Sequence, residues 1–140
     1  MSTPNPFVLV APLIALQFAV FGWRIAREIA LDDQNRRTWL LISDLLNFVV
    51  LLAMIGTCVI LPLRSSTFPK LSRVVLAASY VIVCFTPFMI AGHYRLFSRE
   101  GRSIYKQPGS DVPWLTGQEA FFAIMSVGGS IFAAYIVGVE

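Results

Sequence analysis

The sequence has few of the residues on which metal and redox sites depend. It contains one histidine, His93, and two cysteines, Cys58 and Cys84, among 140 residues. The cysteines form no CxxC pair and no metal-ligand spacing. A haem held by two histidines is excluded within one chain, so only a haem shared across a dimer, with one ligand per protomer, would remain. We therefore expect no bound metal and no cofactor.

Charged residues are also scarce. They make up 14% of the chain, whereas a typical soluble domain has about a quarter. Hydrophobic residues make up 56%, and the mean hydropathy is +0.71. A core of this size would be too small to hide so much apolar surface, so we expect lipid to cover part of it. The net charge of +3 does not indicate nucleic acid as a partner, because the basic residues flank apolar stretches, where they meet anionic lipid headgroups.

The first apolar stretch lacks the basic leader of a secretory signal. No Lys or Arg lies between Met1 and Trp23. A cleavable signal begins with a basic segment before its apolar core. We therefore expect this stretch to remain in the mature protein.

Four long apolar stretches interrupt the chain, each close to the roughly 20 residues that a helix needs to cross a bilayer. None alternates apolar and polar residues as a membrane β-strand would. We predict an all-α integral membrane protein, a bundle of four transmembrane helices forming one domain over residues 1–140. The expected helices cover residues 7–30, 38–63, 72–95 and 117–139. The last follows Thr116-Gly117-Gln118-Glu119, a capping-box pattern typical of a helix start.

The connections between these helices differ in charge, and the difference predicts the orientation. Eight of the eleven Lys and Arg residues belong to the first and third connections, and three belong to the second. The positive-inside rule then places the first and third connections in the cytoplasm and both termini on the non-cytoplasmic side. In the third connection we expect turns around residues 108–113 and a short basic surface helix over residues 95–105.

Five polar residues are expected to lie at the cytoplasmic side of the bundle. They are Arg24, Asp44, Asn47, His93 and Glu119. An ionisable group at membrane depth costs about 2.5–3.5 kcal/mol on insertion scales, so each is a candidate for function. We favour a structural interpretation, in which these groups form ion pairs and a polar clasp between helices. The alternatives are the entrance of a transport pathway and a proton relay.

Two helices carry small residues at every fourth position. The first helix has Ala11, Ala15 and Ala19, and the fourth has Ser126, Ser130, Ala134 and Gly138. Small residues let helices approach closely in lipid, where hydrophobic association is weak. We therefore assign both stripes to helix packing, either within one chain or between protomers.

No motif in the sequence identifies an activity. Our leading hypothesis is a small polytopic membrane protein that acts as a non-enzymatic subunit or a homo-oligomer, with membrane lipids and other protomers as partners. One alternative is a small transporter or channel with a polar cytoplasmic entrance. A further alternative is a membrane enzyme acting on a lipid or another hydrophobic substrate.

Overall fold

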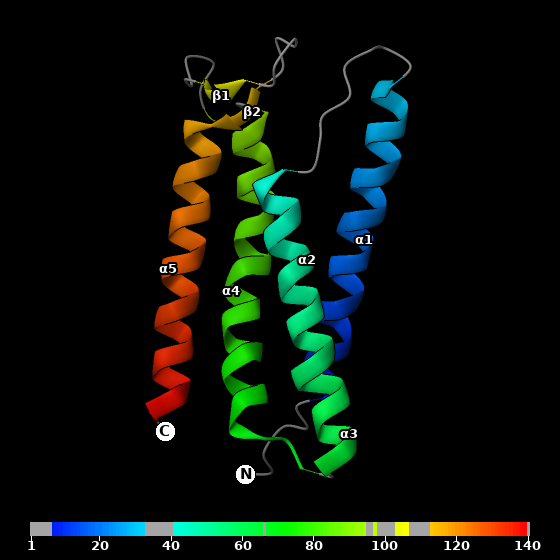
Figure 1. Ribbon diagram of the computed structural model, residues 1–140, viewed down its shortest axis with the longest axis vertical. Helices are drawn as coiled ribbons and strands as arrows, with labels where there is room; N and C mark the ends of the chain where they lie inside the picture. The colour runs from blue at the N-terminus through cyan, green and yellow to red at the C-terminus, as the bar shows by residue number, and fades with distance from the viewer. Residues whose placement is uncertain are drawn as a thin grey trace.

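A computed structural model of the chain describes residues 7–32, 41–65, 67–94, 97, 103–106 and 113–139 (Figure 1). The described part is mostly helical. Its helices are α1 (Phe7–Asp32), α2 (Ile42–Met54), α3 (Leu61–Ser65), α4 (Lys70–His93) and α5 (Gly117–Val139). A π-helical segment, Ile55–Ile60, joins α2 and α3 into one continuous rod. Four helical spans in the described residues are long and apolar enough to cross a membrane, which confirms the expected number of long apolar helices.

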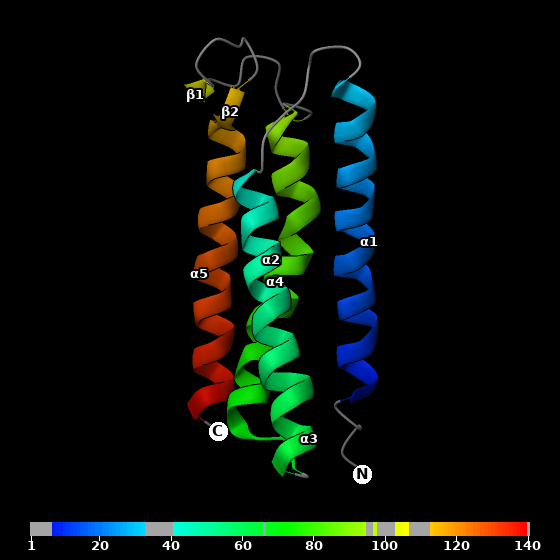
Figure 2. The ribbon, with the colours of Figure 1, turned by 45° about the vertical axis from the view of Figure 1, so that its right-hand side comes forward.

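The four long helices run up and down in turn (Figures 1 and 2). The end of the bundle where α1 begins and α5 ends is called the terminal end below. The end where α1 and α4 finish and α2 and α5 start is called the connection end. The hairpin of α4 and α5 forms the most extensive contact, α2 packs on α4, and α1 lies against α2 and α4.

Each helix lies close to its expected range. The helix expected over 7–30 is α1, and the one over 38–63 is the rod Ile42–Ser65, with residues 38–40 outside the described part. The helix expected over 72–95 is α4, and the one over 117–139 is α5. Thr116 Oγ1 accepts a hydrogen bond from the amide of Glu119 at 3.1 Å, as the capping pattern predicts for a helix start at Gly117.

The mostly helical fold also contains one short strand pair, which the sequence did not predict. Strands β1 (Ser103–Lys106) and β2 (Pro113–Thr116) pair antiparallel at the connection end. The surface helix expected over 95–105 is therefore wrong for its last three residues, which begin β1, and most of its remainder lies outside the described residues. Aromatic side chains favour the strand pair, because Tyr105 and Trp114 meet edge to face across it with ring centroids 5.7 Å apart.

The interior divides into an apolar half and a polar half. The apolar cluster occupies the middle and the terminal end of the bundle. It consists of Val10, Leu13, Val50, Met54, Cys58, Leu76, Ile82 and Val83. Most of the buried ionisable and amide side chains lie toward the connection end instead. The polar half is therefore the part of the interior where a functional site is to be sought.

The π-helical segment has a local cause in Pro62. In this segment the amide of Leu61 donates to the carbonyl of Gly56, five residues earlier. Pro62 has no amide hydrogen, so the carbonyl of Thr57, five residues before it, lacks a helix donor. The hydroxyl of Ser72 on α4 donates to that carbonyl, and the Cys58 thiol donates to the Ser72 carbonyl at 3.3 Å. The interruption thus ties the rod to α4.

Candidate functional site

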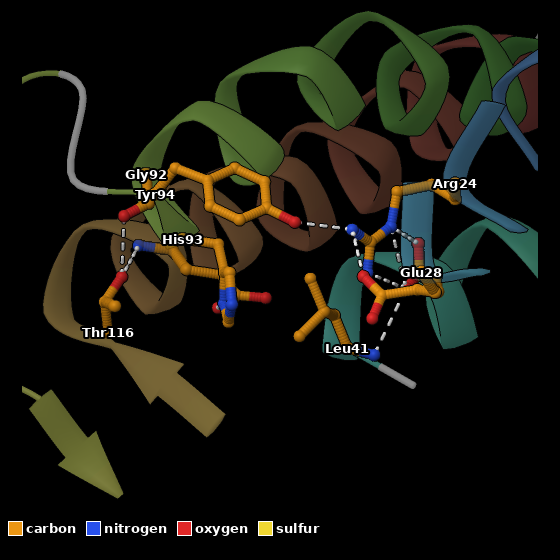
Figure 3. Close-up of polar contacts among 9 residues, drawn as sticks. Arg24, Glu28, Leu41, Gly92, His93, Tyr94 and Thr116 are labelled. Atoms are coloured by element: carbon orange, nitrogen blue, oxygen red, sulfur yellow. Dashed lines mark hydrogen bonds and ion pairs between the residues drawn. The ribbon is translucent and has the colours of Figure 1, made fainter. Parts of the chain in front are cut away.

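A buried ion pair joins α1 and α2 near the connection end (Figure 3). The guanidinium of Arg24 holds both carboxylate oxygens of Asp44, with Nε 3.1 Å from Oδ1 and Nη2 3.0 Å from Oδ2. The residues are 3% and 8% exposed. Asp44 lies in the first turn of α2, where a negative charge suits the helix dipole, and its Oδ2 also accepts the Leu41 amide at 3.2 Å. Asp44 therefore stabilises the first turn of α2 and binds this helix to α1.

The same guanidinium reaches two further groups. Arg24 Nη1 donates to the hydroxyl of Tyr94, at the end of α4, at 2.6 Å, and it lies 3.1 Å from Glu28 Oε1 one turn along α1. The five donors of an arginine suit such a junction, because they are fixed in one plane and remain charged. One side chain thereby connects α1, α2 and the end of α4.

A second polar contact between α1 and α2 lies deeper in the bundle. Gln17 Nε2 donates to Asn47 Oδ1 at 3.1 Å, and both side chains are buried. Gln17 lies about two turns before Arg24, and Asn47 about one turn after Asp44. Gln17 Oε1 and Asn47 Nδ2 have no hydrogen-bond partner among the residues that the structure describes.

A separate pair joins α4 and α5. His93 Nδ1 lies 2.8 Å from Glu119 Oε2, and both side chains are fully buried. Thr116 Oγ1, which caps α5, donates to the carbonyl of Gly92 at 2.8 Å. A Cβ at Gly92 would lie 2.9 Å from the Glu119 amide nitrogen, so the absence of a side chain there lets the two helices approach.

The five candidate residues therefore form two pairs and one amide contact. Arg24 pairs with Asp44, His93 pairs with Glu119, and Asn47 pairs with Gln17. His93 and Tyr94, which are neighbours in sequence, link the two pairs. Tyr94 accepts a hydrogen bond from Arg24, and its ring meets the His93 ring edge to face with centroids 5.1 Å apart.

The sequence interpretation missed three residues of the network: Gln17, Glu28 and Tyr94. Gln17 could have been identified from the sequence, because it is the one strongly polar residue inside the first apolar stretch. Glu28 could also have been identified, because it follows Arg24 at i+4. The role of Tyr94 depends on where α4 ends relative to α1, which no local pattern encodes.

The chemistry available to this polar cluster is limited by its closure. The Arg24–Asp44 ion pair and the His93–Glu119 contact are both buried, and in each the polar groups bind one another. No group of three or more His, Cys, Asp or Glu side chains in the described ranges is placed to hold a metal ion. The arrangement resembles a clasp more closely than an open reaction centre.

The small-residue stripe of α5 faces α4 of the same chain. Ser126 and Ser130 are buried, and Ser130 Oγ lies 3.1 Å from the Ala78 carbonyl of α4. A Cβ at Gly138 would lie 3.9 Å from a methyl group of Val74. Ala134 lies between these positions on the helix and is half-buried. This stripe is therefore occupied within the chain.

The stripe of α1 lies on the outside of the bundle. Ala11, Ala15 and Ala19 are all exposed, as are Gly22 and Ala26. A Cβ at Gly22 would meet no atom within 4 Å. The buried face of α1, which carries Gln17 and Arg24, points the opposite way. The two stripes thus have different environments.

A cleft of about 850 Å³ separates α1 from α4 along much of their length. Its walls are mostly apolar, with Arg27 and Tyr94 toward the connection end and Tyr80 at the other end. The Tyr80 hydroxyl donates to the Leu9 carbonyl of α1 at 3.2 Å. Polar contacts therefore join α1 and α4 above and below the cleft.

Comparison of the chain with protein-family models, with curated proteins and with solved structures finds no match.

Proposed function

We propose that the chain is a four-span integral membrane protein that acts as a non-enzymatic, self-associating subunit, with both termini on the non-cytoplasmic side. The observation that carries the proposal is the exposed small-residue face of α1, formed by Ala11, Ala15, Ala19, Gly22 and Ala26. In lipid such a face gains stability by close approach to another helix. The equivalent stripe of α5 already contacts α4, so the face of α1 is the one left for a second protomer.

The polar cluster supports a structural role for the ionisable residues. Arg24 and Asp44 bridge α1 and α2, and His93 and Glu119 bridge α4 and α5. The Arg24–Asp44 pair neutralises charges that would otherwise be costly at membrane depth. These residues hold the helices of one protomer together, while α1 presents its outer face to another.

Two glycines give a matched test of the self-association. Gly22 on α1 and Gly128 on α5 are both helical and exposed, and a Cβ at either would meet no atom within 4 Å. We expect Gly22→Leu and Ala15→Leu to weaken self-association, measured by energy transfer between labelled protomers in vesicles. Gly128→Leu adds the same bulk elsewhere and should leave energy transfer unchanged. Equal loss in all three variants, or no loss in any, would contradict the proposal.

A small transporter is the second candidate, and buried polar atoms favour it. Ser43 Oγ, Asn47 Nδ2 and Gln17 Oε1 are buried without a hydrogen-bond partner in the described part of the chain. Such atoms commonly bind internal water. A file of bound waters at these atoms would form a polar path into the bundle from the connection end. Ion and proton flux into vesicles decides between the two: we expect no flux above that of empty vesicles. Flux that Asn47→Leu abolishes would favour the transporter.

A further inference from the structure

We propose that the cleft between α1 and α4 binds an anionic phospholipid of the surrounding bilayer, with its phosphate at Arg27 and one acyl chain along the cleft. This inference rests on the membrane insertion proposed above but not on self-association. The volume of about 850 Å³ lies within the range of about 300–1,000 Å³ that is usual for small-molecule sites. The site would be open to lipid on one side, with its polar end at the connection end.

The shape of the cleft suits an acyl chain. Its α1 wall extends from Leu13 to Arg27, a distance of about 21 Å at about 1.5 Å per residue, or two-thirds of a hydrocarbon core of about 30 Å. Leu16 and Trp23 on this wall are each about half exposed, at 51% and 52%. The surrounding bilayer supplies acyl chains at high concentration, and a chain filling the cleft would regain the packing contacts that an empty cleft lacks.

The polar atoms of the walls are mostly satisfied by the protein itself. The Tyr80 hydroxyl donates to the Leu9 carbonyl, and the Thr86 hydroxyl donates to the Ile82 carbonyl at 2.9 Å. The Tyr94 hydroxyl accepts from Arg24. Among the lining side chains in the described ranges, Arg27 Nη1 is the buried nitrogen or oxygen atom that lacks a hydrogen-bond partner. The cleft wall therefore contains a positively charged guanidinium with a nitrogen atom that the described part of the protein leaves unsatisfied.

The geometry of Arg27 suits an anion at this position. Its Cζ lies 3.6 Å from the centroid of the Tyr94 ring, so the guanidinium is held by a cation–π contact. The neighbouring Arg24 is already engaged by Asp44 and Glu28. A guanidinium fork matches the oxygen atoms of a phosphate, and Arg27 lies one turn before the end of the span at Ala30, near the headgroup level. A phosphodiester with one negative charge complements it.

Quenching of Trp23 by brominated lipids tests the proposal, because Trp23 lines the cleft. Trp39→Phe and Trp114→Phe leave Trp23 as the only tryptophan. In vesicles of phosphatidylcholine we expect brominated phosphatidylglycerol to reach half-quenching at about a fivefold lower mole fraction than brominated phosphatidylcholine. Arg27→Gln should remove this preference. The matched control Arg73→Gln, which changes an exposed arginine of α4 at the terminal end, should retain it.

Several outcomes would overturn the proposal. Equal quenching by the two lipids, or a preference that persists in Arg27→Gln, would remove the assigned phosphate site. A preference for a brominated free fatty acid without one for phosphatidylglycerol would assign the cleft to a different ligand. Cys84→Phe, which fills the cleft from an exposed position on α4, gives a second test and should reduce quenching by both lipids. Energy transfer in the same vesicles reports self-association separately.

Discussion

Arg24 links more helices through its side-chain contacts than any neighbouring residue on α1. Its guanidinium contacts Asp44, Glu28 and Tyr94, from three helices or their ends. In a low-dielectric interior, the cost of leaving one member unpaired exceeds the net value of the pair. The consequence is an asymmetry between removing one partner and removing both.

That asymmetry can be measured by a double-mutant cycle. Arg24→Met should lower the free energy of unfolding by about 3–5 kcal/mol, because the Asp44 carboxylate is left buried and unpaired. Arg24→Met combined with Asp44→Leu should be less destabilising than Arg24→Met alone. Unfolding in mixed micelles provides the measurement, and Arg73→Met, an exposed substitution, is the control. Additive effects of the two changes would contradict the clasp.

A pair of glycines tests the close approach of α4 and α5. Gly92→Ala would place a Cβ 2.9 Å from one backbone atom and 3.0 Å from another, so the helices must separate, at a cost of about 1–3 kcal/mol. Gly128→Ala meets open space and should stabilise by up to about 1 kcal/mol through helix propensity. The same micelle titration measures both. A neutral Gly92→Ala would mean that the hairpin contact is not tight.

At the scale of elements, the rod from Ile42 to Ser65 is the most unusual part of the fold. Its π-helical segment follows from the missing amide of Pro62, and Ser72 of α4 satisfies the carbonyl that this leaves free. Hydrogen bonds between membrane helices average about 0.6 kcal/mol, with a maximum of about 1.7. The carbonyl that lacks a donor within the rod thus binds the rod to α4.

This attachment should depend on the proline. We expect Ser72→Ala to destabilise the chain by about 0.6–1.7 kcal/mol. In a Pro62→Ala background the same change should cost less, because the new amide of residue 62 can serve the Thr57 carbonyl itself. Unfolding of the four variants measures the coupling. An identical cost of Ser72→Ala in both backgrounds would contradict this account.

The elements also show which parts of the fold can be predicted from local sequence. Four apolar stretches were sufficient to predict four helices, and Thr116 marked the start of α5 to the residue. The strand pair was missed because each strand is only four residues long and the first three residues of β1 were assigned to a basic helix. The partner of each small-residue stripe was left open for a different reason: it depends on the rotation of each helix about its axis relative to its neighbours, which is set by the whole bundle.

For the whole molecule, the sequence placed the polar residues at one side but not their pairings. Asp44, His93 and Glu119 share an end because alternate helices run in opposite directions, a consequence of topology alone. That Asp44 selects Arg24, and His93 selects Glu119, depends on which helices are neighbours. The cleft could not be predicted from the sequence either, because it depends on the spacing between α1 and α4.

The proposed orientation is a property of the whole chain and can be tested directly. With Cys58 and Cys84 replaced by serine, a cysteine at Thr67 should react with an impermeant maleimide added to intact cells. A cysteine at Ser103 should react only after the cells are opened. Thr67 lies exposed between α3 and α4, at the terminal end. Labelling of Ser103→Cys from outside intact cells would reverse the orientation.

The unequal contacts of α1 have a consequence for biogenesis. The α4–α5 hairpin is joined by extensive close packing. Helix α1 packs less extensively, through Val10 and Leu13, and side-chain hydrogen bonds at Leu9, Gln17 and Arg24 complete its attachment. The acceptors of Gln17 and Arg24, and the donor to Leu9, all lie on segments that a ribosome makes later. We therefore expect α1, which is synthesised before these partners, to remain undocked in the bilayer until they are inserted.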